Sequence, residues 1–404
     1  GWRGAGSVIR GRRAALTGMH STAKHMKDKV KEIDEQIVAD DMMTSSITSE
    51  QGKVNLYAYN ATGLEELLVT WGQPKFRAKQ LWQWLHVRGT TDFDLMMDIP
   101  KDMRAKLKEV ATLGTLTLAA EQVSKDGTIK RAYELHDGQV IEAVLMPYND
   151  GRRTACISSQ AGCAMGCVFC ATGQMGFARQ LTSSEILEQV QRFHVELTAK
   201  GERLSNVVLM GMGEPLGNYN NVLEAVRRIN TEIGIGARHI TISTVGLVPR
   251  ILRLAKEGLQ VKLAVSLHAA TDAERSAIMP VNLRWPLAEL MAACDEYVKQ
   301  TGRRISFEWA LIAGQNDTPE VAHKLGKLLS TLNDSCHVNL IPLNPTEGFD
   351  GAPTKAADCK VFVDILSTYG VAATPRVRRG IDIDAGCGQL KAKVNKVLGR
   401  GGAP

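Results

Sequence analysis

Long apolar runs are missing from this 404-residue sequence. None approaches the roughly 18 consecutive residues that a helix needs to cross a bilayer, so no membrane partner is expected. Cysteine is also scarce: the eight cysteines in the chain are too few for a disulfide scaffold at this length. The net charge of +6 is small, and it permits a nucleic-acid partner without establishing one. The 44% hydrophobic content is enough for one large domain with attachments.

Acidic residues are absent from the chain before Asp28, where several Arg, Ser, Ala and Gly residues occur instead. This composition is typical of an organellar transit peptide. A disordered extension or an over-translated leader, with Met19 or Met26 as the true start, explains it equally well. Residues 1–50 are therefore set aside as a disordered or targeting extension. The expected compartment is the cytoplasm, or an organelle matrix or plastid stroma if the leader is a transit peptide.

Three of the eight cysteines, Cys163, Cys167 and Cys170, form a C-x3-C-x2-C pattern. Three thiolates on one loop can bind three corners of a [4Fe-4S] cluster, whereas an electron-transfer cluster normally takes four cysteines. The fourth iron is then left for a small chelating molecule, and S-adenosylmethionine has the amino and carboxylate groups for this. Structural zinc is the alternative, but zinc sites usually add a second C-x2-C or an H-x3-H pattern, and none follows here. Clustered thiolates also indicate a reducing compartment.

Strand and helix patterns alternate regularly beyond Arg153. The expected strands are 155–158, 206–210, 239–243, 262–266, 305–311 and 337–341, and the expected helices are 183–197, 221–229, 249–257, 286–299, 319–332 and 354–369. Six such units predict an α/β fold with a parallel sheet. Because eight units close a full barrel, we expect an open, partial (β/α)6 barrel whose open side admits a large substrate. A further strand is expected at 374–379.

The segments before the barrel have different patterns. From Leu56 to Leu113 the sequence is helical and basic, with helices expected from Gly63, over 76–87 and over 100–110. Its interleaved aromatic and cationic residues predict RNA contact, and a solvated charged face is the alternative. Turns at Asp126-Gly127 and Asp137-Gly138 separate three expected strands. The expected domains are a helical accessory domain at 51–114, an antiparallel β linker at 115–150, the barrel at 151–375, and a C-terminal segment at 376–404 with a cysteine loop and a basic tail.

Polar residues occur just past the expected strands, where functional groups gather in parallel β/α folds. Gly213 and Glu214 follow the second strand, where glycine lets a ligand approach the backbone and the carboxylate can meet an ammonium group. The other strand-end residues are Ser243, Ser266, Leu267, His268 and Asn344. Each turn taken singly is weak evidence, and a lone histidine is more often structural. Around one cysteine loop, the turns together predict a cofactor pocket.

Two cysteines outside the triad also stand out. Cys156 lies on the first barrel strand, and Cys387 lies in a loop of small residues, 382–390, that is short enough to enter the site. A buried apolar thiol is the alternative for either one alone. The other cysteines, which have no motif, are interpreted as buried thiols: Cys294, Cys336 and Cys359.

Four segments together resemble the RlmN/Cfr family of radical-SAM RNA adenine methyltransferases: the cysteine loop through Gly173, 210–215, 266–268 and 384–390. The resemblance runs from about Leu56 to Leu390. It is specific, because the triad occurs throughout the radical-SAM superfamily while the terminal cysteine loop matches this family. It implies a [4Fe-4S] cluster on the triad and two molecules of S-adenosylmethionine per turnover. The residues implied to bind S-adenosylmethionine are Gly213, Glu214, Ser243, Ser266, Leu267, His268 and Asn344.

The resemblance also implies distinct roles for the remaining residues. Cys387 takes a methyl group and becomes linked to the adenine, and Cys156 then forms a disulfide with Cys387 to release the methylated RNA. Glu142 matches the family's proton acceptor, with a turn one residue longer before Cys156. The implied substrates are a peptidyl-transferase-centre adenosine of 23S-type rRNA and the adenosine beside a tRNA anticodon, extruded from the stack. An electron donor such as flavodoxin or ferredoxin is expected, and the protein is expected to be a monomer.

Two alternatives remain. Cfr-like members methylate carbon 8 of adenine, whereas the stretch 382–384 and the long helical N-terminal region favour the carbon-2 branch. In a different class, the protein is a zinc-stabilised RNA-binding module without catalysis. That interpretation leaves Cys156, Cys387 and the turns of the expected pocket unexplained.

Overall fold

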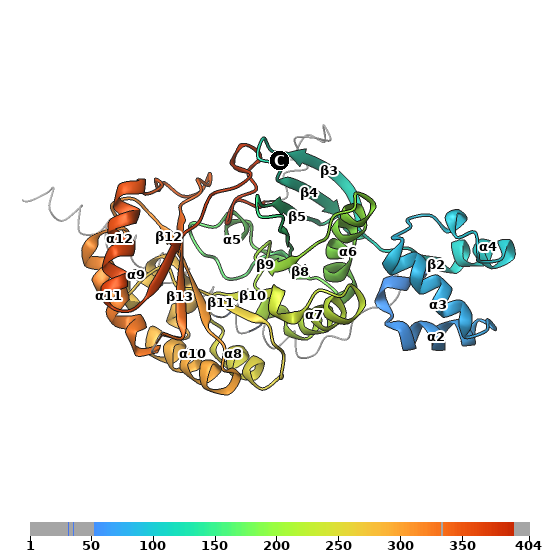
Figure 1. Cartoon of the computed structure of the whole chain (residues 1–404), viewed down its shortest axis with the longest axis horizontal. Coiled ribbons are helices and arrows are strands. Elements are labelled where there is room, and N and C mark those ends of the chain that lie inside the picture. Colours follow the sequence, from blue (N-terminus) through green and yellow to red (C-terminus); the bar gives the residue numbers. More distant parts are fainter. Residues whose placement is uncertain (1–30, 32–34, 36–51, 333, 392–404) are drawn as a thin grey trace, which may run out of the picture.

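A computed structural model describes residues 31, 35, 52–332 and 334–391. Figure 1 shows a small helical module beside a larger α/β body with a curved sheet. Most of the predicted leader, with Met19 and Met26, and the basic tail from 392 lie outside the described residues. Within the described part of the chain, no helix has the length and apolar character to span a membrane.

The helical module has its own apolar core, separate from that of the large body. Its elements are β1 (Val54–Asn55), α2 (Ala61–Thr70), α3 (Phe76–Trp82), a π-helical turn (Gln83–Val87), α4 (Lys101–Val110) and β2 (Ala111–Thr112). The expected helix over 76–87 therefore changes to a wider turn after Trp82. Arg228 of the large body donates to the carbonyl of Tyr57 at 2.6 Å, and Gln191 donates to that of His86 at 2.8 Å. These bonds fix the module against α6 (Ser183–Ala199) and α7 (Tyr219–Glu232) of the large body.

Seven strands of the ten-stranded sheet are parallel, in the order β14-β13-β12-β11-β10-β9-β6. These are β6 (Arg153–Cys156), β9 (Asn206–Leu209), β10 (Ile240–Thr244), β11 (Lys262–Ser266), β12 (Ile305–Leu311), β13 (Cys336–Pro342) and β14 (Ala372–Pro375). Their helices are α6 (Ser183–Ala199), α7 (Tyr219–Glu232), α8 (Val248–Ala255), α9 (Asp272–Ile278), α10 (Leu287–Thr301), α11 (Pro319–Leu329) and α12 (Ala356–Thr368). Helices cover the outer face of the curved sheet (Figure 1). The predicted α/β class and partial (β/α)6 barrel are confirmed.

Local sequence signals mark where several elements begin and end. Thr182 and Glu185 form a capping box at the start of α6, in which each side chain accepts the backbone N–H of the other residue. Gly302 ends α10 in the left-handed conformation, which costs glycine little because it has no Cβ. The expected Asp126-Gly127 turn is present, with Gly127 at φ +80°. These positions are readable from the sequence because each depends on a few adjacent residues.

Three antiparallel strands extend the same sheet beyond β6. They are β3 (Thr117–Val123), β4 (Ile129–Glu134) and β5 (Val140–Pro147), in the region expected as a linker. β5 pairs with β6, and Val144 lies opposite Cys156. Because side chains alternate along a strand, Glu142 faces the same side of the sheet as Val144 and Cys156. These strands are therefore part of the barrel wall as well as a connection.

The last strand is shorter than expected and begins earlier. β14 ends at Pro375, whereas the expected strand runs over 374–379. Its final hydrogen bond runs from the N–H of Arg376 to the carbonyl of Leu340, at 2.7 Å. The ladder stops because Pro342, at the end of the neighbouring strand, has no N–H to donate. The chain then leaves the edge of the sheet and crosses to the opposite end, near β3 and β4 (Figure 1).

Candidate active site

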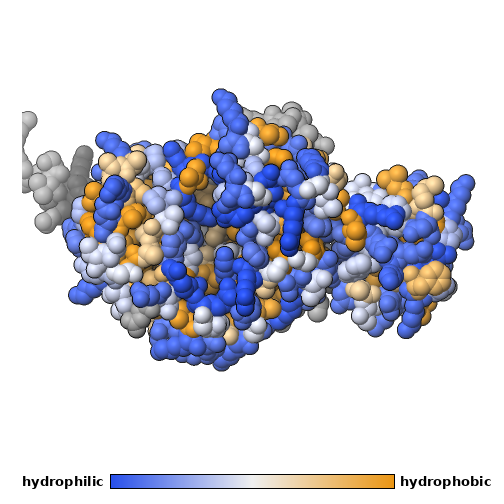
Figure 2. All heavy atoms as spheres, viewed as in Figure 1, coloured by the Kyte–Doolittle hydropathy of each residue, from blue (hydrophilic) through white to orange (hydrophobic). Residues whose placement is uncertain are grey.

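Two adjoining pockets open at the carboxyl ends of the parallel strands. We call the larger one, of about 160 Å³, the triad pocket, because Cys163, Cys167 and Cys170 line it. We call the smaller one the thiol pocket, because Cys156 and Cys387 line it. The two pockets share four lining residues: Met210, Ile341, Asn344 and Cys387. Figure 2 shows a hollow in this face of the molecule, with apolar residues in its depth and polar residues around it.

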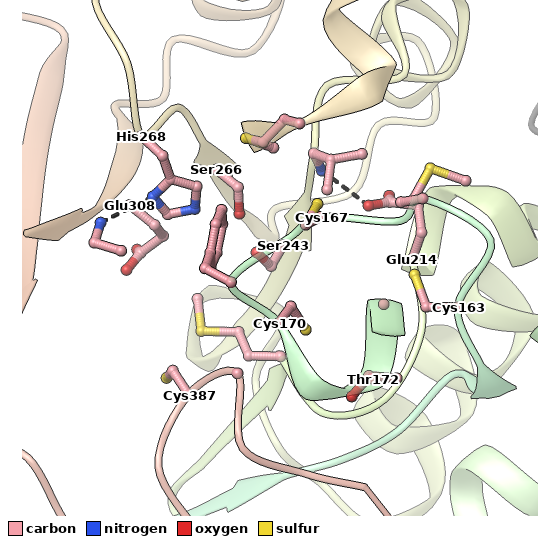
Figure 3. Close-up of a pocket in the computed structure, with 18 of the residues that line it drawn as sticks. Cys163, Cys167, Cys170, Thr172, Glu214, Ser243, Ser266, His268, Glu308 and Cys387 are labelled. Atoms are coloured by element: carbon pink, nitrogen blue, oxygen red, sulfur yellow. Dashed lines mark hydrogen bonds between the residues drawn. The ribbon is translucent and has the colours of Figure 1, made fainter. Parts of the chain in front are cut away.

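The triad loop begins directly after β7 (Gln160–Gly162) and continues into α5 (Ala171–Met175). The chain then returns as β8 (Phe177–Gln180), which pairs antiparallel with β7. The N–H of Cys163 donates to the carbonyl of Gly176 at 2.7 Å. Gly162 has φ +78°, and a Cβ there would lie 2.1 Å from that carbonyl oxygen, so a larger residue would push the hairpin apart. Figure 3 shows the three cysteine side chains around the pocket.

The three triad thiols line one cavity. Within the described ranges, no group of three or more His, Cys, Asp or Glu side chains is arranged to hold one metal ion. Cys163 and Cys167 are buried and Cys170 is half-buried, so the thiols surround a cavity. Burial raises the pKa of Cys163 and of Cys167, and their neighbouring thiols act in the same direction. Such thiols release their protons when a metal binds them, which couples cluster binding to proton loss.

Glu214 is a buried carboxylate of the triad pocket, on the turn after β9. Its carboxylate accepts the N–H of Leu216 at 3.0 Å and the N–H of Val245 at 2.8 Å. Burial raises its pKa to about 7, and these hydrogen bonds oppose that rise. A ligand ammonium group would offset the cost of the buried charge. Gly213 precedes it at φ +101°, where a Cβ would lie 2.5 Å from Gln160, so this turn needs glycine.

The other residues expected to bind S-adenosylmethionine lie in the same pocket, with one exception. The lining includes Ser243, Ser266, His268 and Asn344, as well as Gly213 and Glu214. Figure 3 shows Ser243, Ser266 and His268 facing the pocket from successive strand ends. Leu267 is fully buried and does not line the pocket; its backbone N–H donates to the carbonyl of Glu308 at 3.0 Å. The structure therefore brings together six of the seven expected residues.

His268 and Asn344 both offer a defined hydrogen-bonding atom to a ligand. The Nδ1 atom of His268 accepts the N–H of Ala310 at 2.8 Å, so Nε2 carries the ring proton. Burial lowers the pKa of His268 to about 3, which keeps the ring neutral. The Nδ2 atom of Asn344 donates to the carbonyl of Cys387 at 3.1 Å, and its buried Oδ1 has no hydrogen-bond partner. An amide oxygen in this position is an acceptor for a ligand hydroxyl or amine.

Cys156 and Cys387 line the thiol pocket from two distant parts of the chain. Cys156 is the last residue of β6 and is buried, whereas Cys387 is on an exposed loop; both are free thiols. Burial raises the pKa of Cys156 to about 12, and Arg376 acts in the opposite direction. The cysteine loop packs on α5: the N–H of Ala171 donates to Gly388 and the hydroxyl of Thr172 donates to Leu390, both at 2.7 Å. Cys387 therefore lies beside the triad loop (Figure 3).

Glu142 is buried, and its carboxylate holds the chain just after the cysteine loop. Its Oε2 atom accepts the N–H of Lys391 at 3.0 Å, and its Oε1 atom lies 3.6 Å from the Nζ of Lys130. Glu142 does not line either of the two pockets described above. It shares the sheet face of Cys156, as the pairing of β5 with β6 requires. Its predicted role as a proton acceptor remains a prediction.

Two charged residues of the site, Arg275 and Glu308, escape sequence analysis. Arg275 on α9 is fully buried and donates to the carbonyls of Leu267, Val245 and Ser266, so it joins the turns after β10 and β11. Glu308 lies on β12 and lines the triad pocket, and Arg376 lines the thiol pocket. A buried acid in the otherwise apolar stretch of β12 is a recognisable signal for Glu308. Arg275 stands in an ordinary charged context, which gives no such signal. Arg376 belongs to the arginines that flank the catalytic segments, and the sequence suggests these as phosphate ligands, a role that stays a prediction.

A carboxylate clasp connects the cysteine loop to the β3–β4 turn. Asp382 accepts the N–H of Lys125 at 3.2 Å and the hydroxyl of Ser124, and Asp126 accepts the N–H of Gly380 at 3.1 Å. Charged acceptors make stronger hydrogen bonds than neutral ones. We define the clasp as these two carboxylates with their donors.

Replacing both clasp carboxylates, Asp126→Ala with Asp382→Ala, is expected to loosen residues 376–391. Their amide hydrogens should exchange several-fold faster, because local opening no longer breaks the clasp. Hydrogen–deuterium exchange measured by mass spectrometry checks this. Asp295→Ala removes a partly exposed aspartate of an ion pair on α10 and serves as the control. Unchanged exchange over 376–391 in the double variant would show that the clasp does not hold the loop.

An open β/α barrel with a C-x3-C-x2-C loop after its first strand defines a radical SAM enzyme. The Radical SAM superfamily matches residues 157–325, and the ribosomal RNA large subunit methyltransferase N-terminal domain matches residues 54–113. The superfamily uses a [4Fe-4S] cluster with S-adenosylmethionine, so the predicted cofactors are confirmed.

Whole-chain comparisons assign the family. The chain is 52% identical over 345 residues to the dual-specificity RNA methyltransferase RlmN 1 of Myxococcus xanthus, covering 85% of this chain and 95% of that protein. It is 47% identical over 350 residues to a probable dual-specificity RNA methyltransferase RlmN of Chloroflexus aurantiacus, covering 84% and 93%. A crystal structure of a radical SAM methyltransferase from Sphaerobacter thermophilus has 47% identity and a TM-score of 0.81, covering 84% and 99%. The chain therefore belongs to the RlmN family, and the zinc-stabilised binding module is not favoured.

Proposed function

We propose that the protein is an S-adenosylmethionine-dependent methyltransferase that acts on carbon 2 of adenosine, in the peptidyl-transferase-centre region of large-subunit rRNA and beside the anticodon of tRNA. The observation that carries this proposal is the convergence of five cysteines on two adjoining pockets, with Cys387 common to both. The names of the relatives, which describe dual-specificity RNA methyltransferases, support RNA as the substrate.

The three triad cysteines hold the cluster in this proposal. When bound, the cluster supplies the electron for reductive cleavage of S-adenosylmethionine. Glu214 meets the ammonium group of S-adenosylmethionine, and the Oδ1 atom of Asn344 accepts a hydrogen bond from it or from its ribose. The pocket turns exclude water from this chemistry, because most of their side chains are buried.

Cys387 carries the methyl group, because carbon 2 of adenine is electron-poor and does not attack a sulfonium methyl group itself. The thiol of Cys387 loses its proton and forms a bond to the methyl carbon, while the bond from that carbon to the sulfonium sulfur breaks. The exposed position of Cys387, on the wall common to both pockets, supports contact first with the methyl donor and then with the RNA.

Cys156 releases the product in this proposal. Its thiolate attacks the sulfur of Cys387, a disulfide forms, and the bond between that sulfur and the RNA-bound carbon breaks. The electron pair of the broken bond stays with the RNA carbon, which takes a proton. Before this release, the methyl carbon on Cys387 gives a hydrogen atom to the 5′-deoxyadenosyl group of a second S-adenosylmethionine and bonds to carbon 2. The linked base then loses one electron, which the oxidised cluster would take back, and the proton of carbon 2, which Glu142 accepts. The position of Glu142 on the sheet face of Cys156 supports this role.

Mapping the modified nucleoside tests the function. The protein, reconstituted anaerobically with its cluster, is incubated with reductant, S-adenosylmethionine and either an rRNA fragment or tRNA. Nucleoside mass spectrometry should find 2-methyladenosine in both RNAs. A product containing 8-methyladenosine would make the protein a Cfr-like enzyme instead. A protein that carries its cluster and cleaves S-adenosylmethionine, yet modifies neither RNA, would contradict the proposal.

Glu142→Gln is expected to slow RNA methylation by about 10²-fold or more, because the amide cannot accept the proton. The glutamine oxygen can still accept the N–H of Lys391, so the chain after the cysteine loop keeps its anchor. Single-turnover methylation of RNA, measured beside formation of S-methylcysteine at Cys387, checks this. The rate of RNA methylation should fall, and the formation of S-methylcysteine should be unchanged. Glu121→Gln on β3 is the matched control, and normal turnover by Glu142→Gln would remove Glu142 from the mechanism.

The remaining features are proposed together with this function. The helical module at 51–114 contacts the RNA, a proposal supported by surface cations such as Arg88, which stacks 4.0 Å from the Trp84 ring. The segments 115–150, 151–375 and 376–404 serve as β extension, barrel and catalytic C-terminal segment. The protein acts as a monomer with flavodoxin or ferredoxin as electron donor. It works in the cytoplasm, or in an organelle matrix or plastid stroma if the segment before Asp28 is a transit peptide.

A further inference from the structure

Arg376 places a cation in the pocket that the thiols of Cys156 and Cys387 line. The hydrogen bond from its N–H to Leu340 fixes its backbone directly after β14. Its Nη1 atom lies 3.5 Å from Oε2 of Glu308 and 4.0 Å from the sulfur of Met210, and its side chain is 33% exposed. The guanidinium group therefore points into the site, with part of it accessible from the pocket.

Glu308 holds this guanidinium group from the neighbouring pocket. Its side chain is 4% exposed. Its Oε1 atom accepts from Nδ2 of Asn339 at 2.8 Å and from the hydroxyl of Ser306 at 3.2 Å. Its Oε2 atom has no hydrogen-bond partner and faces Arg376. A buried carboxylate is costly unless a cation accompanies it, so the pair fixes the direction of Arg376.

The other arginines near the pocket mouth are engaged differently. Arg379 lies 4.4 Å from the centroid of the Tyr148 ring, and Arg152 lies 4.7 Å from the same centroid while pairing with Asp150 at 2.8 Å. Arg379 also lines the thiol pocket, whereas Arg152 lines neither pocket, and both are candidates for contact with RNA phosphates. Arg376 differs from them because its partner is a buried carboxylate inside the barrel.

We propose that Arg376 donates a hydrogen bond to a ring nitrogen next to carbon 2 of the extruded adenine. This inference rests on the proposed function. Nitrogens 1 and 3 of adenine flank carbon 2, and both are hydrogen-bond acceptors. The thiol pocket has other polar lining residues, Tyr148, Asn344, Arg378 and Arg379. Arg376 is the lining cation whose direction an ion pair with a buried carboxylate fixes, so its guanidinium group is the donor best held for the base.

The same contact favours attack at carbon 2. A cation at a flanking nitrogen withdraws electron density from carbon 2, which makes that carbon a better acceptor for the carbon carried by Cys387. The planar N–H fork also sets the orientation of the planar base. Carbon 8 lies on the other side of the purine, between nitrogen 7 and the nitrogen that bears the ribose. Arg376 is therefore a catalytic residue that also selects the position of methylation.

Arg376→Lys, combined with altered substrates, tests this inference. Lysine keeps the positive charge near the thiols but loses the planar fork, so S-methylcysteine should form at Cys387 as in the wild type. RNA methylation should fall by about 10- to 100-fold, the effect of losing one charge-assisted hydrogen bond. The RNA then carries 1-deazaadenosine or 3-deazaadenosine at the target position, which replaces one flanking nitrogen by C–H. One of these analogues should slow the wild type strongly and Arg376→Lys much less. The analogue and the substitution each remove the same hydrogen bond, so their effects should not add.

Arg304→Lys is the matched control, since Arg304 stands before β12 at the other end of the sheet and donates to the carbonyl of Cys336 at 2.9 Å. It should behave as the wild type with every RNA. Equal deaza penalties in the wild type and Arg376→Lys would overturn the inference, as would loss of Cys387 methylation in Arg376→Lys. If neither deazaadenosine slowed methylation by the wild type, the inference would be overturned, whether or not Arg376→Lys folds. Failure of the wild type on unmodified adenosine would instead reject the proposed function.

Discussion

Cys156→Ala is expected to leave the RNA covalently attached to Cys387. The substitution removes the sulfur that attacks the bond between Cys387 and the RNA, while Cys387 and the triad remain in place. Turnover should fall by roughly 10³-fold or more, as when an enzyme loses a nucleophile. The structure supports survival of the fold, because a cysteine-to-alanine change at the end of β6 removes one atom from the edge of a pocket. A denaturing gel should show a slower band that contains both protein and RNA and that disappears after nuclease treatment.

Two further variants separate the roles of the thiols. Cys387→Ala and the Cys156→Ala, Cys387→Ala double variant should form no adduct, because the linking sulfur is gone. Cys359→Ala is the matched control: Cys359 is also buried but lies on α12, outside both pockets, and its variant should turn over normally. Normal release of methylated RNA by Cys156→Ala would show that another group breaks the link. An adduct in Cys387→Ala would place the link on a different residue.

Local patterns predicted most of the fold. The strands over 262–266 and 305–311 have the predicted bounds, because each combines a run of β-forming residues with clear turn signals at its ends. The pairing of β5 with β6 was not predicted, because it depends on which strands meet in space. The early end of β14 follows from Pro342 on another strand, so the sequence of β14 itself does not reveal it. Sequence patterns therefore located the elements better than the contacts between them.

The candidate site shows the same difference between contiguous motifs, which the sequence predicts, and contacts between distant residues, which it does not. The triad loop and the turn with Gly213 and Glu214 are contiguous motifs, and the structure brings both to one pocket. The pair formed by Glu308 and Arg376 joins β12 to the segment after β14, and neither sequence context indicates the other residue. Sequence analysis also could not show that Glu142 holds the backbone of Lys391. These interactions form because the C-terminal segment crosses the barrel in space. The sequence alone does not show that crossing.

Cys167→Ala is expected to abolish cluster binding and all RNA methylation. Cys167 is buried at the centre of the triad loop, so two cysteines remain for a cluster that needs three from the protein. Wild-type protein purified without oxygen should be brown and contain about four iron atoms per chain, and the variant should contain almost none. Iron analysis and the visible absorption spectrum measure this independently of activity.

The control for this experiment is Cys294→Ala, which removes a buried thiol on α10 outside both pockets and should leave the iron content unchanged. A colourless wild-type protein with one zinc atom per chain would contradict a radical SAM site, whatever the variant does. Full iron content in Cys167→Ala would mean that another thiol replaces it, and Cys387 is the thiol best placed to do so, because it also lines the triad pocket. The Cys167→Ala, Cys387→Ala double variant would then lose the iron. The expected result, loss of iron in Cys167→Ala alone, keeps Cys387 free to carry the methyl group.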